Sequence, residues 1–419
     1  MGRVSRRGAL LAALAAAGDV HGDGATALSA PERKSRPRDS VDPRLLVVGS
    51  GRLGGLVLQQ LISGPTPPRL ALAGRDRAAM EAIARSAEAS ASITGRYIEI
   101  QTIEADLLDA GSIAEALRRF RPTLIFNSTT LQTPSSLLGA LPPALRSRIY
   151  DVGVGFAPWA SFQLPLLHNL MCAARAECPA ALVVNAAFPD GTNAALARRG
   201  LAPAVGIGNI HVLHAFMVKA CARMLDCPEG DLQLTLVAHH VHAYHWPRAE
   251  AADAPCSLNL LRNGRDVSET IERSALVAAT ARATQRPSGD ASQYIVAASA
   301  AAVLSALTSG RPRLMHLPGP LGLEGGYPVS VSQREVALAL PGSVSRSEAR
   351  ELMLQAQRFD GIDSIDDRGD IRLTEAAREV LRSVLGIEAA AVTFENALEF
   401  GAEFRAKLAE LGTKAHRGA

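Results

Sequence analysis

The sequence is short of cysteine, of lysine and of net charge, and each shortage excludes a class of protein. Its five cysteines form no Cys-x-x-Cys pair, and an odd number at irregular spacing argues against a disulfide framework or a zinc site. We therefore expect buried, inert thiols in a reducing compartment. The net charge of +3 over 419 residues gives no electrostatic basis for binding nucleic acid, so no nucleic-acid partner is expected.

Long apolar runs are also missing, which excludes a membrane-spanning helix of the usual length of about 20 residues. We expect no membrane partner. At the N-terminus, Arg6 and Arg7 precede a short run rich in alanine and leucine, which is the order found in a twin-arginine export signal. We expect residues 1–42 to be a disordered leader of a cytoplasmic protein, with export as the alternative.

A glycine motif follows the first apolar run of the chain, at residues 44–48, and leads into a helical pattern. Gly49 allows a tight turn, Gly51 leaves room for a pyrophosphate beside the backbone, and Gly54 lets the helix approach the strand. The order of strand, G-x-G-x-x-G and helix predicts a dinucleotide site at the helix N-terminus. The residues that we expect to bind the cofactor here are Gly49, Ser50, Gly51, Arg52, Leu53 and Gly54.

Apolar runs then alternate with helical segments, which predicts an α/β fold with a Rossmann doubly wound parallel sheet. Strands are expected near residues 69–73, 97–100, 124–126, 148–153 and 181–188. Ser112 and Ser345, with Glu115 and Glu348 three residues later, are each expected to open a helix with a capping box. We expect an NADP-binding domain over residues 43–210 and a second, α+β domain for substrate and dimerisation over residues 211–419.

The end of the second strand bears on the choice of nucleotide. An NAD site usually places a carboxylate there, on the ribose hydroxyls, but this chain has Arg75, with Asp76 next to it. A guanidinium suits a 2′-phosphate, so NADP is favoured over NAD, and Asp76 keeps NAD open. Arg52 is either a second contact to the same phosphate or a solvated charge.

Polar residues follow later strands and are the remaining ligand candidates. Asp106 is expected either to accept from the adenine amino group or to cap a turn. Small polar side chains at the end of the fourth strand suit a nicotinamide-ribose lining, which adds Asn127 and Ser128 to the cofactor set. The substrate candidates, which plain turn or loop roles would also explain, are Asp190, Asn193, Asn209 and Tyr327.

Four histidines lie within residues 239–245, after an alternating pattern that predicts a strand. In a strand His240 and His242 share one face, and either could supply a proton near neutral pH. No carboxylate or cysteine nearby completes a zinc spacing, so we expect no metal. Lys219 is the alternative proton donor, if burial lowers its pKa.

The first part of the chain resembles the saccharopine dehydrogenase-like NADP-dependent oxidoreductases. The resemblance is carried by Val48–Gly54, by Ala73-Gly74-Arg75, and by Asp106, Asn127 and the Tyr150-Asp151 pair, and it covers about residues 44–155. It implies NADP as cofactor and a second domain that holds substrate and often mediates dimers, so a homodimer is expected. No catalytic residue of that family can be matched here.

The sequence therefore predicts an NADP-dependent oxidoreductase. It would transfer hydride to or from a small polar carbonyl, imine or amino-acid-derived substrate, with the protein supplying position and a proton. The alternative is a non-catalytic module that binds NADP and senses redox state.

Overall fold

The computed structural model describes residues 43–64, 69–139, 141–151, 154–250, 253–284, 291–309 and 311–417. All of these belong to one compact unit, Asp42–Ala419. The expected leader, with Arg6 and Arg7, lies outside the described residues and stays a prediction. Within the described residues, no helix has the length and apolar character needed to cross a membrane.

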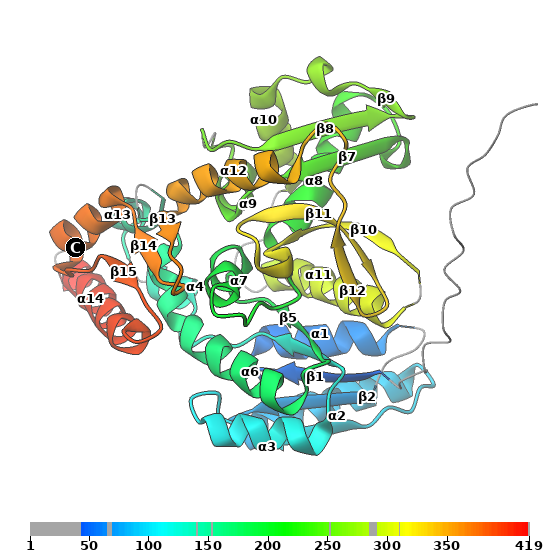
Figure 1. The fold of residues 1–419 in the computed structure, drawn as a ribbon, viewed down its shortest axis with the longest axis vertical. Helices are drawn as coiled ribbons and strands as arrows, with labels where there is room; N and C mark the ends of the chain where they lie inside the picture. Colours follow the sequence, from blue (N-terminus) through cyan, green and yellow to red (C-terminus); the bar gives the residue numbers. More distant parts are fainter. Residues whose placement is uncertain are drawn as a thin grey trace, which may run out of the picture. The chain divides into compact units, whose positions relative to one another are not determined.

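A parallel six-stranded sheet forms the first half of the fold (Figure 1), and its strand order is β3-β2-β1-β4-β5-β6. This is the order of a Rossmann sheet, so the predicted α/β class is confirmed. The strands are β1 (Arg44–Val48), β2 (Arg69–Gly74), β3 (Ile100–Glu104), β4 (Leu124–Asn127), β5 (Leu182–Asn185) and β6 (Val205–Gly206). The helical segments between them are α1 (Arg52–Ile62), α2 (Arg77–Ile93), α3 (Ala110–Phe120), α4 (Pro134–Leu138), α5 (Pro143–Arg146), η1 (Ser147–Asp151), η2 (Ala157–Phe162), α6 (Leu164–Glu177) and α7 (Pro189–Ala197).

Antiparallel sheets of three strands each, with helices between them, make up the rest of the described chain. The strands are β7 (Leu232–Val237), β8 (Ser257–Arg262), β9 (Arg265–Asp266), β10 (Arg313–Pro318), β11 (Gly326–Ser332), β12 (Glu335–Leu338), β13 (Ile362–Ile365), β14 (Ile371–Leu373) and β15 (Ala391–Val392). The longer helices are α8 (Asn209–Met224), α9 (His240–His245), α10 (Arg273–Thr284), α11 (Ala291–Thr308), α12 (Arg346–Ala356), α13 (Glu375–Val380) and α14 (Ala397–Arg417). Short turns of helix are η3 (Glu229–Asp231), η4 (Trp246–Arg248), η5 (Ser268–Thr270), η6 (Pro320–Gly322), η7 (Gln357–Asp360) and η8 (Leu381–Leu385).

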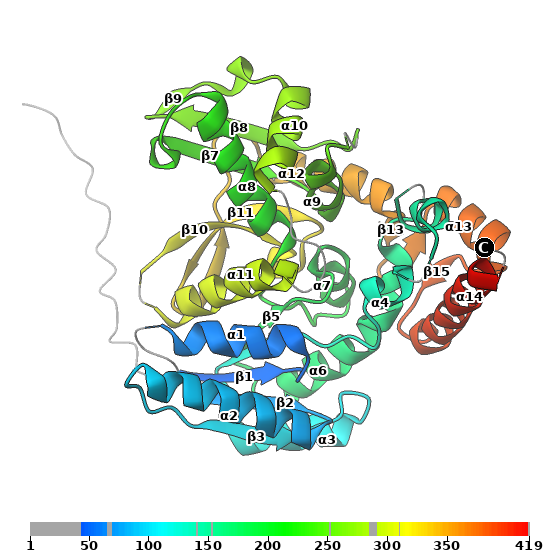
Figure 2. The ribbon, with the colours of Figure 1, turned by 180° about the vertical axis from the view of Figure 1, so that it is seen from behind.

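Both faces of the parallel sheet are covered, as the alternation of β1 side chains requires. Leu45 and Val47 pack in one core with α1, α2 and α11, while Leu46 and Val48 pack in another with α3 and α6. Figures 1 and 2 both show α11 alongside α1, although more than 200 residues separate them in the sequence. The later half of the chain thus shares a core with the sheet, and the predicted domain boundary at residue 210 stays a prediction.

Three local predictions from the sequence are wrong. In the segment predicted as a strand at 148–153, the described residues 148–151 are not a strand, because Ser147–Asp151 forms a turn of π-helix that buries Tyr150 against Phe156 and Trp159. The third strand begins at Ile100 rather than near residue 97. The helix expected to start at Ser112 is capped instead by Asp109.

Other local predictions hold. The Ser345 capping box with Glu348 is present at the start of α12. The alternating pattern that precedes the histidines is a strand, as predicted, and forms β7.

The histidine-rich segment is also not a strand, since residues His240–His245 form α9. Two acceptors explain where the helix begins. A carboxylate oxygen of Asp190 accepts from the His240 N–H at 3.0 Å, and Nδ1 of His242 accepts from the His239 N–H at 3.1 Å. These bonds satisfy N–H groups that a helix start leaves without partners, and the sequence does not show that Asp190 lies nearby.

A second group of histidines lies where α8 meets β10, with His316 buried and His211 and His214 partly buried. The rings of His214 and His316 stack with centroids 3.8 Å apart, and Nδ1 of His211 lies 2.8 Å from the Ser299 hydroxyl. Burial, reinforced by the neighbouring rings, lowers the pKa of His211 to about 4 and that of His316 to about 2. The folded protein therefore holds these rings neutral.

We predict that this cluster makes the protein sensitive to mild acid. As the pH falls from 6.5 towards 4, these histidines become protonated in the unfolded chain but stay neutral in the folded protein. The free energy of unfolding therefore decreases. The variant His316→Phe keeps a ring but cannot titrate, and should lose less stability over this interval in urea unfolding. Met315→Leu on the same strand is the control and should follow the original protein. Equal losses in all three proteins would contradict the prediction.

Candidate functional site

The turn between β1 and α1 admits only glycine at two positions. Gly49 has φ +115°, and a Cβ there would lie 2.6 Å from the Ser128 hydroxyl oxygen. A Cβ at Gly54 would lie 2.1 Å from the carbonyl oxygen of Gly49. These close approaches bring the first turn of α1 directly against the end of the strand, as the motif predicts.

Gly51 differs from its neighbours, because a Cβ there would meet no atom within 4 Å. It is the N-cap of α1 and offers no side chain to the helix N–H groups, and the first turn of the helix carries no acidic residue. The unsatisfied N–H groups and the positive end of the helix dipole therefore face open space, which is the arrangement that binds a phosphate. The residues present fit a dinucleotide pyrophosphate.

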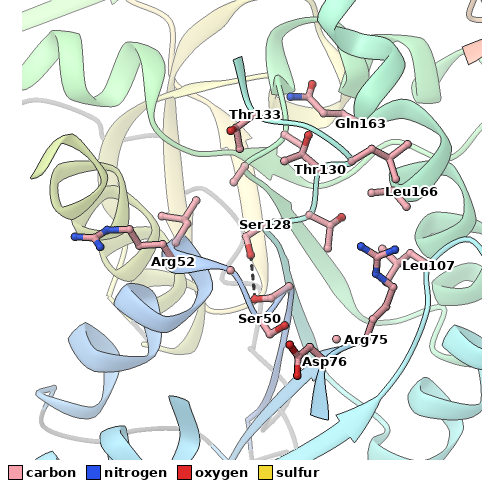
Figure 3. A pocket seen from close by; sticks show the side chains of 18 of the residues that line it. Ser50, Arg52, Arg75, Asp76, Leu107, Ser128, Thr130, Thr133, Gln163 and Leu166 are labelled. Carbon is pink, nitrogen blue, oxygen red and sulfur yellow. Dashed lines mark hydrogen bonds between the residues drawn. The ribbon is translucent and has the colours of Figure 1, made fainter. Parts of the chain in front are cut away.

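A cleft of about 590 Å³ opens in front of this turn, a size typical of small-molecule sites. Figure 3 shows its walls at the carboxyl ends of the parallel strands, where ligands of such sheets bind. The last glycine of the motif, Gly54, is buried beneath the turn and does not line the cleft. Of the predicted cofactor residues, those that line it are Gly49, Ser50, Gly51, Arg52, Leu53, Arg75, Asp106 and Ser128.

Two arginines considered for a ribose phosphate point in different directions (Figure 3). Arg75 follows β2, is exposed and lines the cleft beside Leu107. The Arg52 guanidinium lies 5.9 Å from the centre of the Tyr294 ring, on the side of α11. Asp76 also lines the cleft, but one of its carboxylate oxygens accepts from the Ala79 N–H at 2.9 Å and so caps α2.

Asp106 and Asn127 both have structural partners. Asp106 accepts from the Leu108 N–H at 2.9 Å, so the turn-capping role considered for it is present, and its side chain also lines the cleft. Asn127 is fully buried behind the cleft wall, where its amide donates to Asn185 at 3.0 Å. Asn185 in turn donates to the Asn193 side-chain oxygen at 2.8 Å.

A second cavity, of about 960 Å³, shares part of its wall with the cleft. The residues that line both spaces are Pro134, Gln163, Ala186 and Val296. Gln163 is 7% exposed, and its side-chain oxygen has no hydrogen-bond partner among the described residues. The wall common to both spaces therefore carries an unused acceptor, and a ligand in one space would lie beside a ligand in the other.

His240 lines the second cavity and is paired with a buried carboxylate. Its Nδ1 lies 2.8 Å from Oδ2 of Asp360, and the Phe156 N–H donates to the other oxygen of Asp360 at 2.9 Å. Burial alone would raise the pKa of Asp360, but the charge and hydrogen bond of His240 outweigh it and hold this pKa below its usual value. An ionised Asp360 fixes Nδ1 of His240 as the donor, so Nε2 is the ring nitrogen that can exchange a proton.

Asp360 is the residue that the sequence did not reveal. It ends η7 and is followed by Gly361, which has φ +81° and whose Cβ would lie 2.0 Å from the Val154 carbonyl oxygen. This tight approach holds the carboxylate against residue 156. An Asp-Gly pair is an ordinary turn signal, and nothing in the sequence connects it with a histidine 120 residues earlier.

Of the four predicted substrate residues, one lines the second cavity and three are buried behind it. Asn209 lines the second cavity and donates to Asp190 at 2.6 Å. Asp190 itself is buried and holds the start of α9. Asn193 is buried and donates to the Gly319 carbonyl at 2.9 Å. Tyr327 is fully buried in β11, so these last three are not on the cavity surface.

The other two proton-donor candidates lie elsewhere. His242 is fully buried, and its Nε2 lies 3.1 Å from the Ala254 carbonyl oxygen. The helix therefore separates it from His240, and it lines neither space. Lys219 is exposed and borders a separate surface depression with Arg223 and Asp226. Among the described residues, no three His, Cys, Asp or Glu side chains are grouped to hold a metal ion.

We predict that changing Gly51 or Gly54 to alanine affects stability and dinucleotide binding in different ways. Gly51→Ala adds a methyl group to open space, so the melting temperature should stay within a few degrees while dinucleotide affinity falls. Gly54→Ala pushes α1 off the strand, so both should fall. Thermal melts and equilibrium titration with NADPH measure this. Unchanged NADPH affinity in Gly51→Ala would contradict the expected path of the pyrophosphate.

No family model matches the chain, and no curated protein sequence matches it. Solved structures share its fold. Lactate dehydrogenase from Eimeria maxima, solved with NADH and oxamate, is 14% identical, with a TM-score of 0.53 over 77% of this chain and 92% of that one. Malate dehydrogenase from Plasmodium falciparum is 12% identical, with a TM-score of 0.53 over 81% of this chain and 99% of that one.

Lactate dehydrogenase from Cryptosporidium parvum, complexed with lactic acid and the cofactor, is 13% identical, with a TM-score of 0.50 over 76% of this chain and 97% of that one. At these identities the likeness establishes the fold. The chain has the two-part α/β fold, with a Rossmann sheet, that these dehydrogenases have.

Proposed function

We propose that the protein is an oxidoreductase that uses a nicotinamide dinucleotide and acts on a carbonyl or hydroxyl compound. The observation that carries the proposal is the wall shared by the glycine-loop cleft and the cavity of His240. A cofactor in the first space would lie beside a substrate in the second, and His240, paired with Asp360, lines that second space. The structural neighbours solved with NADH and oxamate, or with lactic acid and cofactor, support the same assignment.

Within this proposal the protein's own groups move one proton. A bound nicotinamide cofactor would supply or accept the hydride. His240 would give a proton to the carbonyl oxygen in reduction and take it back in oxidation, while Asp360 stabilises the charged ring. Asp190 and Asn209 set the position of His240 through its backbone. Gln163 offers its unpaired oxygen to an amide or hydroxyl donor at the junction.

NADP is the cofactor that we favour, and the saccharopine dehydrogenase-like family remains the proposed sequence relationship. Asp76 is engaged in capping α2, which weakens it as a ribose ligand, while the exposed Arg75 beside it lines the cleft. A guanidinium at this place attracts a 2′-phosphate. A homodimer and a cytoplasmic location are part of the same proposal.

The variant Arg75→Ala tests the choice of nucleotide. Hydrogen bonds to charged groups contribute about 1.5–3 kcal/mol, so NADPH affinity should fall roughly tenfold or more, while NADH affinity should change little. Fluorescence titration of both nucleotides measures this. Arg77→Ala, in the first turn of α2, is the matched control and should leave both affinities unchanged. Equal losses of NADPH and NADH in Arg75→Ala would refute the role of this residue.

The variants His240→Gln and Asp360→Asn test the proton-transfer pair. Loss of a general acid typically costs about 10²–10⁴ in rate, so both should lower kcat strongly and leave NADPH binding intact. The control His168→Gln removes a ring on α6 that lines neither space, and it should keep the original turnover. Wild-type turnover by His240→Gln would exclude the proton role. Tight NADPH binding without turnover of any carbonyl, imine or amino-acid substrate would favour the redox-sensing alternative.

A further inference from the structure

One wall of the second cavity is a single helical stripe. His240, Ala243, Tyr244, Pro247 and Arg248 all line it, and positions separated by three or four residues share one face of a helix. With a rise of about 1.5 Å per residue in α9 and about 2 Å in the 3-10 turn η4, the backbones of His240 and Arg248 are about 13 Å apart. The Arg248 guanidinium turns back towards Tyr244 and donates to its carbonyl oxygen. The cavity therefore has a proton-transferring end and a cationic end.

Aromatic rings connect the two ends. The ring of Phe156 lies 4.9 Å from that of His240, and the ring of Tyr150 lies 6.1 Å from that of Phe156. Tyr150 then contacts Tyr244 at 4.7 Å, and the Arg248 guanidinium lies 3.7 Å from the centre of the Tyr244 ring. The cavity wall between His240 and Arg248 is thus lined by aromatic rings, which suit the alkyl chain or aryl ring of a ligand.

The cationic end has a surplus of positive charge. Arg146, at the end of α5, lines the cavity together with Arg248. The acidic Glu250 also lines it, but its carboxylate lies 2.7 Å from Nδ1 of His245. The two guanidinium groups therefore leave the cavity lining with an excess of positive charge, and guanidinium pairs well with carboxylate.

We propose that the substrate is an amphipathic carboxylic acid. Its carbonyl or hydroxyl group lies at His240, an alkyl or aromatic body follows the rings, and its carboxylate pairs with the arginines of the cavity lining, Arg248 and Arg146. This inference rests on the proposed oxidoreductase function. In reduction the carbonyl carbon gains a hydride and its oxygen gains the proton of His240, which gives an alcohol and the oxidised cofactor. The substrate is larger than the small polar compound expected from the sequence.

The test compares 10-oxodecanoate, its methyl ester and pyruvate as substrates of the full chain with NADPH. We expect kcat/KM for 10-oxodecanoate to exceed that for the ester and for pyruvate by roughly tenfold, because the carboxylate forms charge-assisted bonds. Arg248→Gln should remove most of the preference for the acid over the ester, and Arg248→Lys should restore part of it. Arg265→Gln, an exposed arginine on β9 outside the cavity, should behave like the original protein.

A binding measurement separates this inference from the proposed function. Decanoate should bind without cofactor and change the tryptophan fluorescence, since the Trp159 ring lies 6.0 Å from that of Tyr150, and Arg248→Gln should weaken it. Such binding with no turnover of any probe would overturn the oxidoreductase and support the acid site. Faster turnover of pyruvate, unaffected by Arg248→Gln, would overturn the acid site and support the oxidoreductase.

Discussion

The buried amide of Asn185 is the interaction on which the arrangement of the site depends. It joins the ends of β4 and β5 through Asn127 and fixes α7 through Thr192 and Asn193. From Asn193 the chain of bonds continues to the Gly319 carbonyl, at the end of β10. Buried polar groups are costly unless they form hydrogen bonds. These bonds therefore fix the positions of β4, β5, α7 and the end of β10 relative to one another. The helix α7 carries Asp190, so the start of α9 and the position of His240 follow from it.

This dependence explains why the two spaces of the site meet. The parallel sheet brings the glycine turn and the polar strand ends to one edge, as any Rossmann sheet does. The second cavity is assembled from α4, η1, α8, α9 and α11, which come from distant parts of the chain, and its histidine pairs with a carboxylate from the turn before β13. The strand β5 and the helix α7 connect the two spaces, because Asn185 on β5 bonds to α7 and Asp190 on α7 bonds to the start of α9. The alignment of the glycine-turn cleft with the His240–Asp360 pair is therefore a property of the buried network.

The sequence was informative where local chemistry decides the structure. Gly49, Gly51 and Gly54 predicted the strand, turn and helix, because only glycine fits two of these positions. It was misleading where tertiary contacts decide. The alternating pattern before the histidines correctly predicted β7, but the strand does not continue through the histidines, because acceptors on Asp190 and His242 start a helix there. Asp360 could not be found, because its partner is 120 residues away in sequence and its own neighbours resemble an ordinary turn.

The place of Asp360 in the chain has a consequence for how the protein is made. A ribosome that has released residues 43–340 has already supplied the sheet, the glycine turn, α9 and most of the cavity wall. The carboxylate that orients His240 is added only with η7, and the Gly361 turn that seats it is completed by β13 and β14. The residues that line the glycine-turn cleft are therefore synthesised before the carboxylate that pairs with His240. Under the proposed function, each molecule acquires the residues for nucleotide binding before it acquires the complete proton-transferring pair.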